Sequence, residues 1–224
     1  MDIISVLLIL SCLLLLGSSR LNVAIRVVAA QGILLGILPL IRSMGEFTAG
    51  IWVLSISTLI SKGILLPWLM SICVRNSEIR REIEPFIGFG SSLLCGLGLL
   101  ALAVWVTVRM PAIPRKLPVG FLMTSSFFLV FVGLFLMVTR RKAITQSLAY
   151  LVMENGVYGV GVGMSLDFPC VVELGILLDV FVGVFLMGNL LFHLDREFEH
   201  MDVDKLTELS DASELPAAGV ERIA

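Results

Sequence analysis

Long apolar runs, separated by short polar connectors, make up most of the first 194 residues of the chain. Runs of this length are typical of helices that cross a bilayer, whose hydrocarbon layer is about 30 Å thick. The pattern predicts seven membrane-spanning helices, of which the first is short: 3–18, 23–41, 49–74, 86–108, 117–138, 143–164 and 171–194. The expected fold class is therefore all-α integral membrane, a seven-transmembrane-helix bundle with antiparallel neighbours.

The composition agrees with a membrane protein. Hydrophobic residues make up 58% of the chain, its mean hydropathy is +1.01 and only 15% of its residues are charged. Soluble domains contain about 45–50% apolar residues. No basic stripe with interleaved aromatic residues occurs, so a nucleic-acid partner is not expected. Residues 195–224 are polar and acidic, and we expect them to form a tail outside the membrane.

The distribution of Lys and Arg predicts the orientation. With the N-terminus outside, the cytoplasmic segments carry nine Lys or Arg residues when Lys205 and Arg222 are left out, against four outside: Arg42, Arg109, Arg115 and Lys116. Positive charge concentrates on the cytoplasmic side of membrane proteins. We therefore expect the tail in the cytoplasm, and we interpret the run Arg140-Arg141-Lys142 mainly as an orientation signal. The first apolar run lacks a basic leader and a clear cleavage site, so we expect it to be retained.

Three ionisable residues interrupt apolar runs near their middles: Lys62, Glu154 and Asp179. A rise of 1.5 Å per residue places Glu154 roughly 16 Å from the inner surface and Asp179 roughly 12 Å from the outer one, at nearly the same level. Ionisable groups at this depth are costly and usually mark an ion or proton path. An acid–base–acid series fits a lateral proton relay. The alternative is a buried ion pair, such as Lys62 with Asp179, that only fixes helix packing.

Further residues lie beside this series. Tyr158 comes one turn after Glu154 and is placed to hydrogen-bond it, although tyrosine also anchors helices at the membrane interface. Glu173 precedes Asp179 by six residues and is either a member of the path or an interfacial acid. Pro67 cannot donate to the carbonyl of Gly63, so a kink with a released carbonyl is expected beside Lys62.

Other residue classes have simpler interpretations. The glycines of run 143–164 predict close approach of a neighbouring helix: Gly156, Gly159, Gly161 and Gly163. The cysteines are scattered, and neither a CxxC motif nor a Cys/His pair with metal spacing occurs, so no metal centre is expected in this chain. No nucleophile–base pair or nucleotide-binding loop appears, so an enzyme acting alone is not expected.

Three segments contain the midplane charges: Ile60-Ser61-Lys62-Gly63-Ile64-Leu65-Leu66-Pro67, Leu148-Ala149-Tyr150-Leu151-Val152-Met153-Glu154-Asn155-Gly156 and Val172-Glu173-Leu174-Gly175-Ile176-Leu177-Leu178-Asp179. Together they resemble the hydrogenase-4 membrane component E family. The chain length and the seven-span layout also agree with that family, so the resemblance covers nearly the whole chain.

The last three spans also resemble subunit K of respiratory complex I, which has a basic loop after its first helix and a glutamate in its second. Arg140-Arg141 followed by Glu154 matches this arrangement. Asp179 stands where that subunit has a third-helix glutamate, with a side chain one methylene shorter. The resemblance implies an N-terminal four-helix membrane region (1–110), a three-helix region similar to subunit K (111–194) and a polar cytoplasmic tail (195–224).

The resemblance implies a non-catalytic subunit of a redox-driven, proton-translocating complex, of the group 4 nickel–iron hydrogenase or formate hydrogenlyase type, in the cytoplasmic membrane of a prokaryote. Its partners would be antiporter-like membrane subunits, a subunit like the heel of complex I, a peripheral hydrogenase arm and membrane lipids. Nickel–iron and iron–sulfur centres are expected in those partners and no cofactor in this chain. The proton path would use Glu154, Asp179, Lys62, Glu173 and Tyr158.

Two other functions are alternatives. The chain could be a structural adaptor that joins antiporter-like subunits to the rest of the membrane arm, or a self-sufficient ion transporter. The sequence shows no visible inverted repeats, which argues against the transporter.

Overall fold

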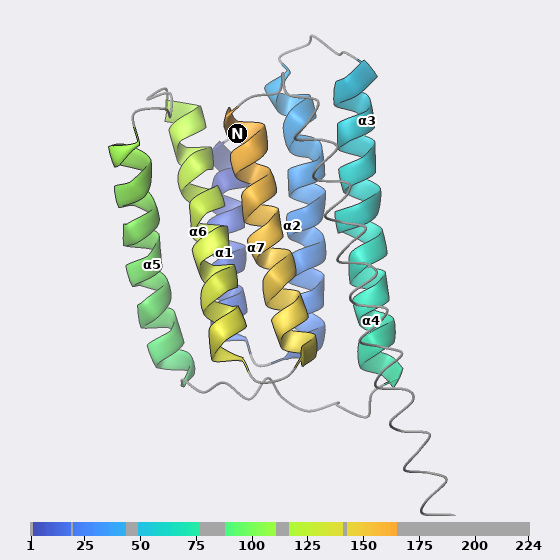
Figure 1. Ribbon diagram of the computed structural model, residues 1–224, viewed down its shortest axis with the longest axis vertical. Coiled ribbons are helices and arrows are strands. Elements are labelled where there is room, and N and C mark those ends of the chain that lie inside the picture. Colours follow the sequence, from blue (N-terminus) through green and yellow to red (C-terminus); the bar gives the residue numbers. More distant parts are fainter. Residues whose placement is uncertain are drawn as a thin grey trace, which may run out of the picture. The chain divides into compact units, whose positions relative to one another are not determined.

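Helices make up nearly all of the chain that the computed structural model describes, which is residues 2–18, 20–43, 49–76, 88–110, 117–140 and 143–164 (Figure 1). Their bounds are α1 (Asp2–Gly17), α2 (Leu21–Arg42), α3 (Ala49–Thr58), the π-helix η1 (Leu59–Leu65), α4 (Leu66–Asn76), α5 (Phe89–Arg109), α6 (Leu117–Thr139) and α7 (Ala143–Met164). Because α3, η1 and α4 follow one another without a break, they form one continuous helix, the α3–η1–α4 helix.

The first six predicted runs each correspond to one of these helices, and every helix end lies within three residues of its predicted place. The long apolar runs and the polar connectors between them were therefore sufficient to locate these helices. The predicted seventh span, 171–194, and the tail, 195–224, lie outside the described residues. The all-helical class is confirmed. Six of the seven predicted helices are present in the described residues, and the seventh stays a prediction.

Four helical stretches are long and apolar enough to cross a membrane: Leu21–Arg42, Ala49–Ile72, Gly90–Arg109 and Val119–Thr139. We also predicted spans at α1 and α7, but these two helices do not meet both requirements of length and apolar composition. α1 has 16 residues, a length of about 24 Å at 1.5 Å per residue. α7 has 22 residues but carries Glu154 and Asn155 at its centre, so its composition is less apolar. Both polar side chains are buried, which explains how a helix inside the bundle can hold them.

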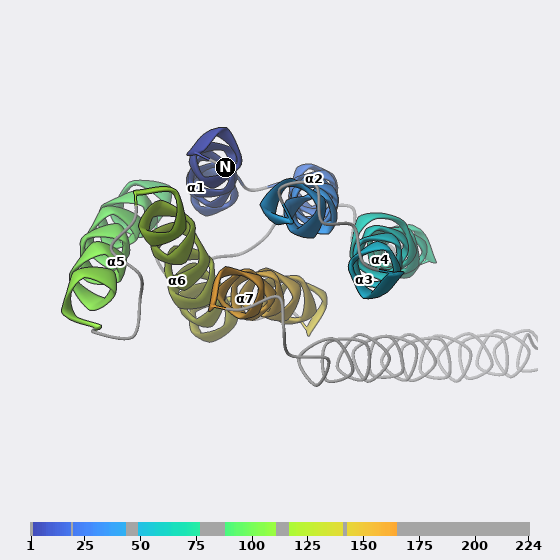
Figure 2. The same cartoon turned by 90° about the horizontal axis from the view of Figure 1, so that it is seen from above.

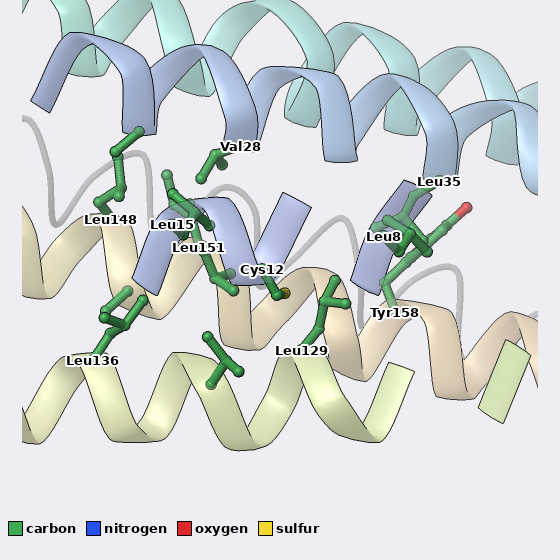
Figure 3. Close-up of a cluster of buried hydrophobic side chains, with 14 of the residues drawn as sticks. Leu8, Cys12, Leu15, Val28, Leu35, Leu129, Leu136, Leu148, Leu151 and Tyr158 are labelled. Atoms are coloured by element: carbon green, nitrogen blue, oxygen red, sulfur yellow. The ribbon is translucent and has the colours of Figure 1, made fainter. Parts of the chain in front are cut away.

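The apolar core lies where α1, α2, α6 and α7 meet. Leucines from all four helices contact one another there, among them Leu8, Leu35, Leu129 and Leu151 (Figure 3). Seen from above, α5 lies beside α6 on one flank, and the α3–η1–α4 helix lies beside α2 on the other (Figure 2). Residues before and after position 110 therefore share one core. The predicted division at that position stays a prediction.

The outward face of the α3–η1–α4 helix is apolar. A ridge with a spacing of four residues is exposed along it: Trp52, Ile56, Ile60, Ile64 and Trp68. α5 also exposes large apolar side chains over most of its length. Side chains of this kind contact lipid or a neighbouring membrane subunit rather than water. Both flanks are thus suited to the interior of a membrane.

α6 and α7 approach each other closely through glycines on both helices. A Cβ atom on Gly133 would lie 2.5 Å from the backbone nitrogen of Met153, and one on Gly156 would lie 2.6 Å from the nitrogen of Val130. Gly159 and Gly163 also face side chains of α6, so the predicted close packing is confirmed at these positions of α7. The contact fixes the rotation of α7, and with it the direction of Glu154.

Replacing Gly133 by alanine should lower the stability of the bundle by about 1–3 kcal/mol, because the added methyl group would meet the backbone of α7 rather than a movable side chain. Gly120 on the same helix is the matched control, since a Cβ there meets nothing within 4 Å. Thermal unfolding of both variants in detergent measures the difference. Equal stability of Gly133→Ala and Gly120→Ala would contradict the close α6–α7 contact.

Candidate functional site

Lys62 and Glu154 form a buried ion pair in the middle of the bundle. The Lys62 Nζ lies 2.8 Å from Glu154 Oε1, and the two side chains are 4% and 2% exposed. Lys62 thus points into the bundle and contacts an acid, as both the relay and the ion-pair interpretations require. The acid is Glu154 of α7, whereas the ion-pair alternative in the sequence analysis had paired Lys62 with Asp179.

The π-helix η1 places Lys62. The N–H of Leu66 donates to the carbonyl of Ser61, five residues earlier, whereas an α-helical bond spans four. Pro67 has no N–H to continue the α-helical pattern, which accounts for a local change of helix type before it. The structure has a π-helical segment at the place where a kink with a released carbonyl was predicted. Such segments are rare and are frequent at functional sites.

Two glycines of α2 hold this segment. A Cβ on Gly32 would collide with the carbonyl group of Lys62, and a Cβ on Gly36 would lie 3.1 Å from the Cα of Leu59. α2 therefore packs against the backbone of η1, since no side chain stands between them. This contact fixes the segment that carries Lys62.

Tyr158 completes the surroundings of the pair. The Lys62 Nζ lies 5.6 Å from the centroid of its ring, a distance at which the ring face attracts a cation. The hydroxyl of Tyr158 accepts a hydrogen bond from Thr58 Oγ1 at 3.0 Å. Figure 3 shows the ring beside the apolar cluster, with the hydroxyl pointing away from it. Because Tyr158 is only 8% exposed, it does not lie at the surface as an interfacial anchor would.

An amide network, missed in the sequence analysis, joins α1, α2 and α7 beside the pair. Gln31 Nε2 donates to Ser11 Oγ at 2.8 Å and to Cys12 Sγ at 3.7 Å. Asn155 Nδ2 donates to Gln31 Oε1 at 3.4 Å. Gln31 is fully buried. The available signal was a glutamine near the middle of a predicted membrane span, where it needs a polar partner.

Two predicted members of the site, Asp179 and Glu173, lie outside the described residues. Their place in a proton path stays a prediction. Among the described residues, no three His, Cys, Asp or Glu side chains come close enough together to hold a metal ion. The functional chemistry of the described site therefore rests on one ammonium group, one carboxylate and the hydroxyls and amides around them.

Arg140, the first residue of the basic run, is buried at the end of α6 with 3% of its surface exposed. Burial lowers the pKa of its guanidinium group. Its Nη1 has no hydrogen-bond partner among the described residues, and its carbonyl accepts a bond from Gln146 Nε2 at 3.0 Å. Arg140 thus takes part in packing at the end of the bundle, in addition to any role in orientation.

The geometry of the Lys62–Glu154 pair is compatible with two roles, transfer of a proton and the fixing of helix packing. In a medium of low dielectric constant, an ammonium and a carboxylate in contact stabilise each other strongly, whereas either charge alone is costly. A pair that only fixes packing would have the same geometry, and the two roles differ in whether a proton moves.

Known proteins similar to this chain include a membrane hydrogenase component. The chain is 31% identical to hydrogenase-4 component E of Escherichia coli K12 over 163 residues, which cover 71% of this chain and 72% of that protein. Hydrogenase-4 component E of Shigella flexneri gives the same values. The uncharacterized protein Rv0085 of Mycobacterium tuberculosis is 31% identical over 205 residues, which cover 91% of this chain and 93% of that protein. No family model and no solved structure matches the chain.

Proposed function

Because the chain belongs to the hydrogenase-4 component E family, we propose that it is a non-catalytic membrane subunit of a redox-driven hydrogenase complex that translocates protons. In this proposal Lys62 and Glu154 carry protons across the middle of the membrane. The observation that supports it best is their buried contact at 2.8 Å, held by a π-helix that α2 fixes from behind.

The proposed cycle uses the coupling between the two charges. A proton that arrives at Glu154 makes the carboxyl group neutral and leaves the Lys62 ammonium without a counter-charge in a medium of low dielectric constant. Lys62 then releases one proton to the other side of the pair and becomes a neutral amine. Transfer of the proton from Glu154 to Lys62 restores the ion pair. One proton has entered at Glu154, one has left from Lys62, and no bond between heavy atoms has changed.

The rest of the assembly follows from the family. We propose antiporter-like membrane subunits and a subunit like the heel of complex I as neighbours, with nickel–iron and iron–sulfur centres in a peripheral arm. Residues 111–194 would be equivalent to subunit K of complex I, and Asp179 would exchange protons with Glu154 as a further member of the path. The N-terminus would lie outside and the tail in the cytoplasm of a prokaryotic cell.

A structural adaptor is the second candidate, and the exposed apolar ridge from Trp52 to Trp68 favours it. The ridge would contact a neighbouring membrane subunit, and the ion pair would only fix the helix that presents it. The adaptor would assemble as the proton-carrying subunit does, so assembly cannot separate the two. Proton movement after neutralisation of Glu154 separates them.

Purification of the native assembly through an affinity tag on this chain tests membership. We expect hydrogenase subunits, nickel and iron to co-purify, and vesicles that contain the assembly to move protons when the peripheral arm transfers electrons. A strain with the untagged chain is the control for adsorption to the resin. Recovery of the chain without any redox subunit would overturn the proposal, and redox activity without proton movement would leave only the adaptor.

A further inference from the structure

Three buried hydroxyl groups lie on one side of the Lys62–Glu154 pair. Thr58 and Ser55 precede Lys62 on the α3–η1–α4 helix, with 4% and 3% of their surfaces exposed. Their spacing from Lys62, four and seven residues, places all three on one helix face. Tyr158 follows Glu154 by one turn on α7 and meets Thr58 through the hydrogen bond at 3.0 Å. The hydroxyls therefore extend from the pair toward the end of the bundle where α3 begins and α7 ends.

Thr58 and Ser55 differ from the buried hydroxyls of α6 in what they bind. On α6, Thr124 donates to the carbonyl of Gly120, and Ser125 and Ser126 both donate to that of Leu122. Such bonds satisfy a hydroxyl within its own helix. Thr58 instead donates across to α7. Ser55 Oγ is buried and has no hydrogen-bond partner within the described residues, although buried polar atoms are normally paired.

We infer that Tyr158, Thr58 and Ser55 form the leg of the proton path between Lys62 and the end of the bundle at Ala49, which the charge distribution predicts to be the outer side. This inference rests on the proposed function. The leg covers about 10 Å of depth from Lys62 to Ser55 at 1.5 Å per residue. Water that hydrogen-bonds Ser55 would continue it toward the surface.

A hydroxyl is suited to this step because it both accepts and donates a hydrogen bond. The proton released by Lys62 binds to one hydroxyl oxygen, and that oxygen releases its own proton to the next acceptor. Between Thr58 and Ser55 this acceptor would be a water molecule, and each hydroxyl is left neutral. Rotation about the C–O bond then restores the first arrangement. One proton leaves the Lys62 side, one appears beyond Ser55, and no oxidant or reductant is required.

The amide network on the other side of the pair lacks this property. The amide nitrogens of Gln31 and Asn155 donate and do not accept, and the Ser11 hydroxyl at the end of the network donates to the carbonyl of Leu8 at 2.6 Å. A proton passed to an amide would leave a buried charge on a weakly basic group. The amides therefore hold α1, α2 and α7 together without leading protons toward α1.

The test compares hydroxyl deletions that conserve shape. In vesicles with the intact assembly, Thr58→Val and Tyr158→Phe should each lower redox-driven proton movement on the order of tenfold, less than the 10²–10⁴-fold typical of losing a proton-transferring side chain, because water can replace one hydroxyl in part. Thr58→Ser keeps the hydroxyl and should restore most of the rate. Ser125→Ala, which removes a hydroxyl bound within its own helix, should leave the rate unchanged.

The outcomes separate this inference from the proposed function. If Glu154→Gln stops proton movement while Thr58→Val and Tyr158→Phe move protons at the wild-type rate, the hydroxyl leg is wrong and the path through the pair stands. If Glu154→Gln also moves protons normally, the proposed function fails first. A loss in Thr58→Val that Thr58→Ser does not restore, with reduced assembly, would assign Thr58 a packing role and overturn the inference.

Discussion

Replacing Lys62 by methionine should destabilise the folded bundle by about 3–5 kcal/mol, because the Glu154 carboxylate would stay buried without its cation. The loss of packing is small in this change, since methionine fills much of the volume of the lysine stem. For a chain of this size, such a loss corresponds to a fall in melting temperature on the order of 10 °C. Thermal unfolding of the purified protein in detergent measures it.

The double variant Lys62→Met/Glu154→Met is the control for this prediction. It removes both charges, so no uncompensated charge remains, and replacing a buried ion pair by apolar residues is often neutral or stabilising. We expect the double variant to unfold at or near the wild-type temperature and to have lost proton movement. A double variant as unstable as Lys62→Met would show that the pairing with Glu154 is not the cause of the instability.

The helices could be predicted from the sequence because each apolar run ends in polar or helix-breaking residues. The run at 143–164 has the bounds of α7 itself, although Glu154 and Asn155 interrupt it. The start of α5 differs most, at Phe89 instead of residue 86. Gly88 is the N-cap of α5, and hydropathy alone does not locate a cap.

The pairing inside the site was harder to predict than its members. Lys62 and Glu154 were identified as charged residues at the depth of the membrane centre, and Tyr158 as a residue one turn from Glu154. The structure brings the three together. Depth along a helix follows from the rise per residue, but it says nothing of the rotation of the helix or of its neighbours. The rotation of α7 depends on its close contacts with α6 at Gly133 and Gly156. These contacts form only when the helices pack together.

The π-helix illustrates the same limit. Pro67 predicted a local distortion, and the missing N–H explains it, but a proline kink and a π-helical segment are both compatible with that signal. The choice between a kink and a π-helix depends on Gly32 and Gly36 of α2, which allow the backbone of η1 to approach closely. The amide network was missed for a related reason, since Gln31 and Asn155 come together only when α2 packs beside α7.

Glu154→Gln should abolish most of the coupled proton movement, with a decrease of roughly 10²-fold or more, while the assembly remains intact. Glutamine keeps the shape of glutamate and can still accept a hydrogen bond from Lys62 Nζ, but it does not take up a proton. The ammonium would then have no exchanging partner on α7. Electron transfer from the peripheral arm to an artificial acceptor should continue, because Glu154 would bind no redox centre.

Three comparisons make this prediction specific. Glu154→Asp keeps a titrating group one methylene further from Lys62 and should keep part of the proton movement. Asp179→Asn should lower it less than Glu154→Gln does, if Asp179 exchanges protons with Glu154 as proposed. Proton uptake by vesicles is measured together with the electron-transfer rate and the amount of assembled complex. An assembled Glu154→Gln complex that moves protons at the wild-type rate would leave the buried pair with a packing role, because a side chain that cannot be protonated cannot be a necessary step in the path.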